Sequence, residues 1–135
     1  MVARKMKQFV VDGADALEQA CSESFVPLRV NAAATSLRGE LLHAQITPGV
    51  GMARGTCGRS ELVRTPRLVA EQPREDVLLS LFTHGRGEIR QSGRAAVLGS
   101  GAGALYDAAR PYTLSFPGPM SQLVLQVPPQ VAGPA

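Results

Sequence analysis

The sequence predicts a mostly β protein, an antiparallel sandwich or barrel of short strands with one helix near the N-terminus. After Pro27, apolar and polar residues alternate with a period of two in six short runs. Turn-forming residues separate these runs, and the chain contains 14 glycines and 10 prolines. Many short strands at such spacing are typical of antiparallel sandwiches and barrels. A chain of 135 residues has the length of one domain.

The first eleven residues are expected to form an arm. Its basic residues Arg4, Lys5 and Lys7 are the densest positive cluster of a chain whose formal net charge is +3. A terminal cluster of this size is usually solvated, and no basic recognition helix accompanies it, so nucleic-acid binding by this chain alone is not expected. The apolar residues 9–11 are expected to pack on a barrel, their own or a partner's, because large apolar side chains are unfavourable in water. The alternative is a frayed terminus.

A helix is predicted over residues 12–25. Asp12 is the expected N-cap, and Asp15 lies in the first turn, where a negative charge suits the helix dipole. Five residues share one face at helical spacing, namely Leu17, Ala20, Cys21, Ser24 and Phe25. Cys21 is therefore expected to be a buried packing residue, and both Cys21 and Cys57 are expected to be reduced thiols.

Strands are predicted where the alternation is strict. They are expected at residues 28–31, 42–47, 50–57, 77–82, 112–116 and 122–127. Residues 66–75 are expected to form a short helix or an irregular crossover, and the glycine-rich stretch 99–103 a hairpin turn. Residues 129–135, rich in proline, glycine and alanine, are typical of an interdomain linker. The folded domain is therefore expected to span residues 12–128.

The sequence lacks the signals of membrane and secreted proteins. No run approaches the roughly 20 apolar residues of a membrane span. No apolar segment follows the basic start, as it would in a signal peptide. We therefore expect a soluble, cytoplasmic protein without a membrane partner.

No catalytic motif stands out. A metal-dependent barrel enzyme would need two or three histidines and a carboxylate at one site, and the chain has only His43 and His84, on different predicted strands. Ser100 is not part of a GxSxG motif, and the glycines around it lack the GK[ST] of a phosphate-binding loop. We therefore expect no catalytic residue, no metal and no cofactor.

Two motifs follow each other toward the C-terminus. The first, GxGxxxQxGRxxxL, contains Gly85, Gly87, Gln91, Gly93, Arg94 and Leu98. The second, YDxxRPYxLxFP, contains Tyr106, Asp107, Arg110, Pro111, Tyr112, Leu114, Phe116 and Pro117. Together they resemble the effector-binding domain of AraC-type transcription regulators. The segments 25–28 and 63–67 also resemble that family, so the resemblance covers roughly residues 12–128.

This resemblance implies a cupin-like antiparallel β-barrel, a double-stranded β-helix, with a pocket for a small-molecule effector. It also implies a regulator that dimerises and changes its DNA binding when the pocket fills. The chain has Ser100-Gly101-Ala102 where the family usually has Pro-Gly-Asp, which keeps the glycine that the turn needs. It lacks a helix-turn-helix region, so we expect DNA contact only through a domain that this sequence does not contain.

Three of the six candidate ligand contacts lie in the second motif. Arg110 could hold an acidic ligand at the barrel mouth through two hydrogen bonds. Alternatively, it pairs with Asp107 and fixes the bend at Pro111, and we favour this second interpretation. Tyr106 and Tyr112 are more often packing residues whose hydroxyl groups are satisfied.

The other three candidates are Met52, Arg54 and His84. Met52 and Arg54 share one strand face with Val50 and Thr56. If that face points inward, it forms an apolar wall with one charge, as is usual in ligand sites; if it points outward, Arg54 is solvated. His84 could line the rim of a pocket or be an exposed turn residue.

The leading hypothesis is therefore a small-molecule-sensing, non-enzymatic domain of an AraC-type regulator. Two alternatives remain, a cupin-fold enzyme and a pure dimerisation module whose barrel is filled by its own side chains. We expect any homodimer to be weak or to form through strand faces.

Overall fold

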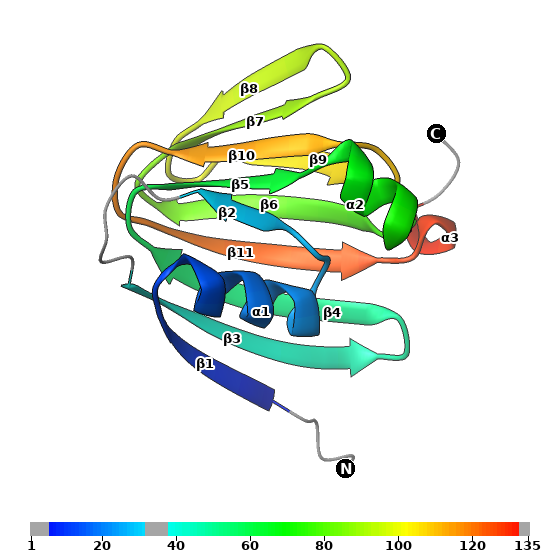
Figure 1. The fold of residues 1–135 in the computed structure, drawn as a ribbon, viewed down its shortest axis with the longest axis horizontal. Coiled ribbons are helices and arrows are strands. Elements are labelled where there is room, and N and C mark those ends of the chain that lie inside the picture. The colour runs from blue at the N-terminus through cyan, green and yellow to red at the C-terminus, as the bar shows by residue number, and fades with distance from the viewer. Residues whose placement is uncertain (1–5, 32–37, 133–135) are drawn as a thin grey trace.

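The computed structural model describes residues 6–31 and 38–132 and shows a β-sandwich with short helices at its margins (Figure 1). The strands are β1 (Met6–Asp12), β2 (Arg29–Asn31), β3 (Arg38–Thr47), β4 (Val50–Cys57), β5 (Ser60–Arg64), β6 (Val77–His84), β7 (Gly87–Gln91), β8 (Arg94–Leu98), β9 (Gly103–Asp107), β10 (Tyr112–Phe116) and β11 (Met120–Val127). The helices are α1 (Ala14–Ser24), α2 (Pro66–Glu71) and α3 (Pro129–Ala132).

The strands form two antiparallel sheets. The six-stranded sheet has the order β1-β3-β4-β11-β6-β9, and the five-stranded sheet the order β2-β5-β10-β7-β8. All nine strand pairings within these sheets are antiparallel. The predicted antiparallel fold with one N-terminal helix is therefore confirmed.

The hydrophobic core lies between the two sheets. The six-stranded sheet contributes Leu41, Ala53 and Phe82, and the five-stranded sheet contributes Leu114 and Phe116, all of them buried. The rings of Phe82 and Phe116 lie 5.9 Å apart and join the two layers. The buried residues of β4 are small, namely Gly51, Ala53 and Cys57.

Helix α1 covers one margin of the sandwich, where it contacts β1, β2 and β3. Its buried face contains Leu17, Ala20, Cys21 and Ser24, as predicted. The expected N-cap is wrong: Asp12 ends β1, and Gly13 occupies the N-cap with a φ of 98° and no side-chain hydrogen bond. The carboxylate of Glu18 instead accepts a hydrogen bond of 2.8 Å from the Val30 amide, which satisfies an edge group of β2.

The described part of the expected arm is a strand. Residues 6–12 form β1 and pair with β3 from Met6 opposite Ala44 to Asp12 opposite Arg38. Val11 is buried and Phe9 packs against the core, whereas Val10 points away and is 76% exposed. The apolar arm therefore packs on its own barrel. The basic residues Arg4 and Lys5 lie outside the described residues.

The six predicted strands are present, but the alternation missed β5, β7, β8 and β9. The missed strands are short, and the small residues Ala95 and Ala96 in β8 and Gly103 and Ala104 in β9 leave these two strands without a strong apolar period. The prediction of a hairpin turn at residues 99–103 is wrong. This stretch crosses from β8 in the five-stranded sheet to β9 in the six-stranded sheet.

Residues 66–75 contain the expected short helix. Thr65 caps α2 by accepting a hydrogen bond from the Leu68 amide, and Pro66 starts the helix. In the segment predicted as a linker, residues 129–132 form the single turn α3. Across the described residues, none of the helices has the length and apolar character needed to cross a membrane.

A row of apolar residues crosses the outer face of the six-stranded sheet. The register places one apolar residue of every strand in a single row, namely Met6, Ala44, Met52, Leu125, Leu79 and Leu105. Met6 and Leu105 are 61% and 71% exposed. The outer face of the five-stranded sheet is polar instead and is described below.

Candidate ligand-binding site

The structure does not bring the six predicted ligand contacts together. Met52 and Arg54 lie on the outer face of β4, where both are exposed, while their neighbours Gly51 and Ala53 are buried. The inward-facing alternative for Met52 and Arg54 is therefore wrong, because the alternation of β4 turns its small residues toward the core. Met52 belongs to the apolar row on the outer face instead.

The two histidines are also separated. His84 is exposed at the end of β6, and His43 lies on β3 with its ring edge-on to Phe25 at 5.7 Å. Partial burial and the nearby Lys7 lower the pKa of His43. Within the described ranges, no three His, Cys, Asp or Glu side chains are grouped closely enough to hold a metal ion.

Tyr106 and Tyr112 meet inside the sandwich, one from each sheet. Their rings are edge-on with centroids 4.8 Å apart, and both residues are buried. The Tyr106 hydroxyl shares a hydrogen bond of 2.7 Å with the fully buried Ser80 hydroxyl. Burial raises the pKa of Tyr106 to about 12 and also raises the pKa of Tyr112. Both phenols therefore stay neutral and join the two layers.

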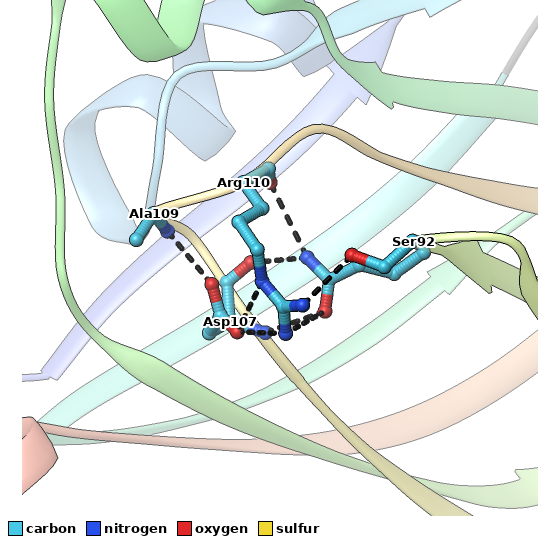
Figure 2. A network of polar contacts seen from close by, with 5 residues as sticks. Ser92, Asp107, Ala109 and Arg110 are labelled. Atoms are coloured by element: carbon cyan, nitrogen blue, oxygen red, sulfur yellow. Dashed lines mark hydrogen bonds and ion pairs between the residues drawn. The ribbon is translucent and has the colours of Figure 1, made fainter.

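The side chain of Arg110 is held by hydrogen bonds to nearby residues of the two turns (Figure 2). Its guanidinium donates to the Asp107 carboxylate at 2.5 Å and to the Ser92 hydroxyl at 2.7 Å. Gln91 completes the network, because its amide donates to the Asp107 carbonyl at 2.7 Å and accepts from the Asp107 amide. This network ties the β9–β10 turn to the β7–β8 turn, in agreement with the structural interpretation of Arg110.

Arg64 is buried completely beneath the same turn. It donates to the carbonyls of Ala108 at 2.9 Å, Pro27 at 3.2 Å and Gln72 at 2.7 Å. Burial lowers the pKa of its guanidinium. Three carbonyls thus compensate a buried cation that has no carboxylate partner among the described residues. Sequence reasoning noticed the segment 63–67 but gave Arg64 no role; the arginine that ends an apolar strand was the available signal.

The two cysteines are free and buried. Burial raises the pKa of Cys21 to about 12 and also raises that of Cys57, whose sulfur lies 3.4 Å from the Ser60 hydroxyl. Because the thiolate is the reactive form, neither residue has the environment of a nucleophile.

A hollow of about 670 Å³ lies on the outer face of the five-stranded sheet. This volume is within the range of small-molecule sites. Its floor is a row of outward residues in register across all five strands, namely Asn31, Glu61, Ser115, Glu88 and Val97. We call this hollow the outer groove.

Two arginines and a proline form the end of the outer groove. Arg59 comes from the β4–β5 turn, Arg86 from the β6–β7 turn, and Pro117 from the β10–β11 turn. No ion pair involves Arg59 or Arg86 among the described residues. Both arginines are exposed, so their guanidinium groups are open to a ligand.

Two glycines fix the position of Arg86. Gly85 has a φ of 75°, and a Cβ there would clash with the Pro119 carbonyl. A Cβ on Gly87 would lie 2.7–2.8 Å from the rings of Phe82 and Phe116. The glycines of the first motif therefore press the turn onto the core, and Arg86 between them projects outward.

Sequence reasoning missed the outer groove altogether. A signal was present, because Arg59-Ser60-Glu61 and Arg86-Gly87-Glu88 repeat an Arg-x-Glu pattern on two strands that flank β10. Their alignment depends on strand order, which the sequence alone did not indicate.

The comparisons with known proteins agree on one family. A model of the AraC-binding-like domain matches residues 17–134. The transcriptional activator NphR of Rhodococcus sp is 40% identical over 70 residues, which cover 52% of this chain and 21% of that protein. A protein of Bacillus sp. (strain OxB-1), described only as uncharacterised and from a nit 5′ region, is 40% identical over 67 residues, 50% of this chain and 26% of that protein. The match thus spans about a quarter or less of these relatives.

Solved structures show the same fold at low sequence identity. The AraC-like transcriptional activator CuxR matches with a TM-score of 0.72 and 15% identity, over 93% of this chain and 48% of that chain. The Clostridium difficile EutQ protein matches with a TM-score of 0.53 and 12% identity, over 73% of this chain and 74% of that chain. An RmlC-like cupin protein from Desulfovibrio desulfuricans matches with a TM-score of 0.51 and 18% identity, over 65% of this chain and 80% of that chain. The fold is therefore cupin-like.

Proposed function

The chain belongs to the AraC-binding-like domain family, and from this premise we propose that it senses a small molecule in the outer groove. In a complete regulator, the occupied groove would change DNA binding by a helix-turn-helix domain. The observation that carries the proposal is a hollow of about 670 Å³ whose end holds two arginines without ion-pair partners among the described residues. An accessible hollow with a few convergent polar groups is the usual form of a ligand site.

The arrangement of the interior supports an outer site over one between the sheets. Phe82, Phe116 and Tyr112 are buried in the space between the layers, and the Tyr106 hydroxyl already has a partner in Ser80. Arg110 is likewise engaged by Asp107 and Ser92. Tyr106, Tyr112 and Arg110 therefore serve the fold in this proposal, and Met52, Arg54 and His84 are not groove residues.

A thermal-shift screen of small metabolites tests the proposal. A ligand at 100 times its Kd stabilises the folded state by about 2.7 kcal/mol, which corresponds to a rise of several degrees in Tm. Ser115→Phe should fill the floor of the groove and abolish the shift. Ser121→Phe, on the opposite outer face, is the matched control and should keep it. A saturable ligand that binds both variants equally would contradict the outer groove as the site.

We further propose that the domain is regulatory rather than enzymatic. The candidate nucleophiles Cys21, Cys57 and Ser100 are buried or engaged, since burial raises the pKa of both thiols and the Ser100 hydroxyl donates to the Thr83 carbonyl at 2.9 Å. Turnover of a groove ligand, followed by mass spectrometry, would contradict this.

The outer face of the six-stranded sheet favours a second copy of this chain as its partner, which would form a homodimer. Its row of apolar residues crosses every strand, and exposed apolar patches of this kind mark interaction sites. Sedimentation velocity would show an association that Leu79→Glu weakens and Ser115→Glu does not. A strictly monomeric wild-type chain at high concentration would contradict the proposal.

A further inference from the structure

We propose that the outer groove recognises a small carboxylic acid that carries an amine or a hydroxyl group at its far end. The inference rests on the proposed function of the outer groove and names the chemical class of its ligand. It is carried by the two Arg-x-Glu segments that flank β10.

The two segments are aligned by the strand register. Glu61 and Glu88 both pair with Ser115, one from each side of β10. Arg59 and Arg86 lie two residues before these glutamates, on the same outer face and toward the turns. Two strand spacings separate the arginine backbones, about 10 Å, which long arginine side chains can bridge by converging over Pro117.

The arginine end of the groove suits a carboxylate. A guanidinium presents donors in a planar fork that matches the two oxygens of a carboxylate. Two such groups without ion-pair partners among the described residues leave a positive field at this end of the groove.

The floor of the groove suits a hydrogen-bond donor on the ligand. Glu88 is paired with Arg90, so its charge is compensated. Among the described residues, Glu61 accepts side-chain hydrogen bonds only from the neutral groups of Asn31 at 3.3 Å and Ser115 at 3.5 Å. Its carboxylate therefore has acceptor capacity left for an ammonium or hydroxyl group.

The spacing of the two ends sets the length of the ligand. Residues i and i+2 of a strand are about 7 Å apart along the strand direction, so the arginine and glutamate rows are separated by about that distance. The exposed side chain of Val97 and the ring of Pro117 border the groove and offer an apolar contact for the body of the ligand. A benzene ring with para substituents spans such a separation.

Four probes of the same size separate the contributions. 4-(Aminomethyl)benzoate and 4-(hydroxymethyl)benzoate carry both the acid and a donor. 4-Methylbenzoate lacks the donor, and 4-methylbenzylamine lacks the acid. Binding to the full chain is followed by calorimetry and by backbone amide NMR shifts of residues 59–61 and 86–88. We expect the two donor-bearing acids to bind at least five times more tightly than 4-methylbenzoate, and 4-methylbenzylamine to bind most weakly.

Three variants test which residues cause the expected differences in affinity among the probes. The double variant Arg59→Gln/Arg86→Gln should weaken binding of all three acids at least tenfold. Glu61→Gln should remove the advantage of the donor-bearing acids and leave 4-methylbenzoate unchanged. Arg94→Gln is the control, because Arg94 is exposed and lies outside the outer groove; this substitution lowers the net charge by one, half the change of the double variant. All variants should keep the wild-type NMR dispersion, since these side chains are on the surface.

The outcomes separate this inference from the proposed function. Equal affinity for the four probes, or an equal effect of Arg94→Gln, would overturn the inference. It also fails if no probe binds while a screened metabolite binds in a manner that Ser115→Phe abolishes, in which case the proposed function stands. If the screen yields only ligands that bind Ser115→Phe normally, the proposed function and the inference fall together.

Discussion

The two ends of β5 carry one arginine each, and their surroundings are opposite. Arg64, at the end of the strand, is fully buried and donates to three backbone carbonyls. Arg59, just before the strand, is exposed and has no ion-pair partner among the described residues. The same contrast extends across the five-stranded sheet, where Arg110 is bound by Asp107 and Arg86 projects from a turn. We call the Arg64 side the closed end and the Arg59 side the turn end.

This difference separates the arginines that stabilise the fold from those whose guanidinium groups can bind a ligand. At the closed end, the guanidinium groups of Arg64 and Arg110 donate to backbone carbonyls and to a carboxylate of the protein itself. At the turn end, two guanidinium groups are positioned by tight turns and left without a carboxylate. A charge held in place without a partner is expected where a ligand supplies the partner.

Arg64→Leu should destabilise the domain most. The substitution removes three hydrogen bonds and leaves the carbonyls of Ala108, Pro27 and Gln72 without that donor in the interior. Breaking a buried polar network of this kind costs about 3–5 kcal/mol in the free energy of unfolding. Urea denaturation followed by circular dichroism measures the change. Arg67→Leu is the control, because Arg67 is exposed in an i,i+4 pair with Glu71, and it should cost below about 0.5 kcal/mol.

Gly87→Ala tests whether the core beneath the turn end is tightly packed, although the arginine side chains above it are unpaired among the described residues. A Cβ at this position would lie 2.7–2.8 Å from the rings of Phe82 and Phe116, so the core must shift. Overpacking of this kind costs about 1–3 kcal/mol. Gly99→Ala, where no atom lies within 4 Å of the added Cβ, is the control in the same thermal-unfolding assay. A variant as stable as the control would mean that the turn end is poorly packed and that Arg86 is not held in place.

Tyr106→Phe removes one hydrogen bond from the interior. It leaves the fully buried Ser80 hydroxyl without its partner at 2.7 Å, which should cost about 1–2 kcal/mol. The double variant Tyr106→Phe/Ser80→Ala should recover part of this loss, because no hydroxyl is then left unpaired. Chemical denaturation of these two variants, of Ser80→Ala and of the wild-type chain completes the double-mutant cycle. Full stability of Tyr106→Phe would show that the hydroxyl pair does not contribute to holding the sheets together.

Arg110→Gln should have a small effect despite its many contacts. The side chain is 55% exposed, and exposed ion pairs contribute at most about 1 kcal/mol. The loss should shrink at high salt, because salt screens the attraction to Asp107. Unfolding curves at low and high sodium chloride measure both effects. A loss as large as that of Arg64→Leu would break the distinction between buried and exposed arginines.

The sequence was sufficient for those features that depend on local pattern. The apolar face of α1 around Leu17 and the alternation of β10 follow from spacing alone, and the Asp107–Arg110 pair follows from a separation of three residues. The orientation of β4 was left open, because an alternation of small and mixed residues fits either face. Gly51 and Ala53 point inward, and a Cβ on Gly51 would lie 2.9 Å from the His43 ring on β3, a contact that no local pattern reports.

Long-range features were not predictable in the same way. Arg64 donates to Pro27 and Ala108, which lie 37 and 44 residues away from it in the sequence. The outer groove likewise aligns residues of five strands. Both depend on the order β2-β5-β10-β7-β8, in which β7 and β8 follow each other in the sequence but the other paired strands are distant. Gly13 as N-cap was missed for a related reason, since pairing of β1 with β3 engages Asp12 in a strand.

The smallest stability effect is expected at the turn end. Arg59→Gln/Arg86→Gln should change the free energy of unfolding by no more than about 0.5 kcal/mol, because surface substitutions away from packed or paired groups are usually within that range. The sign should be neutral or slightly stabilising, since the two positive groups share one end of a groove and repel each other. Differential scanning calorimetry at low salt is sensitive to this change, and Arg94→Gln measures the effect of losing one charge, half the charge change of the double variant. A loss of 2 kcal/mol or more, on the order of a buried hydrogen bond, would mean that these arginines hold the fold together as Arg64 does. The contrast between the two ends of β5 would then disappear, and with it the reason to assign the outer groove to a ligand.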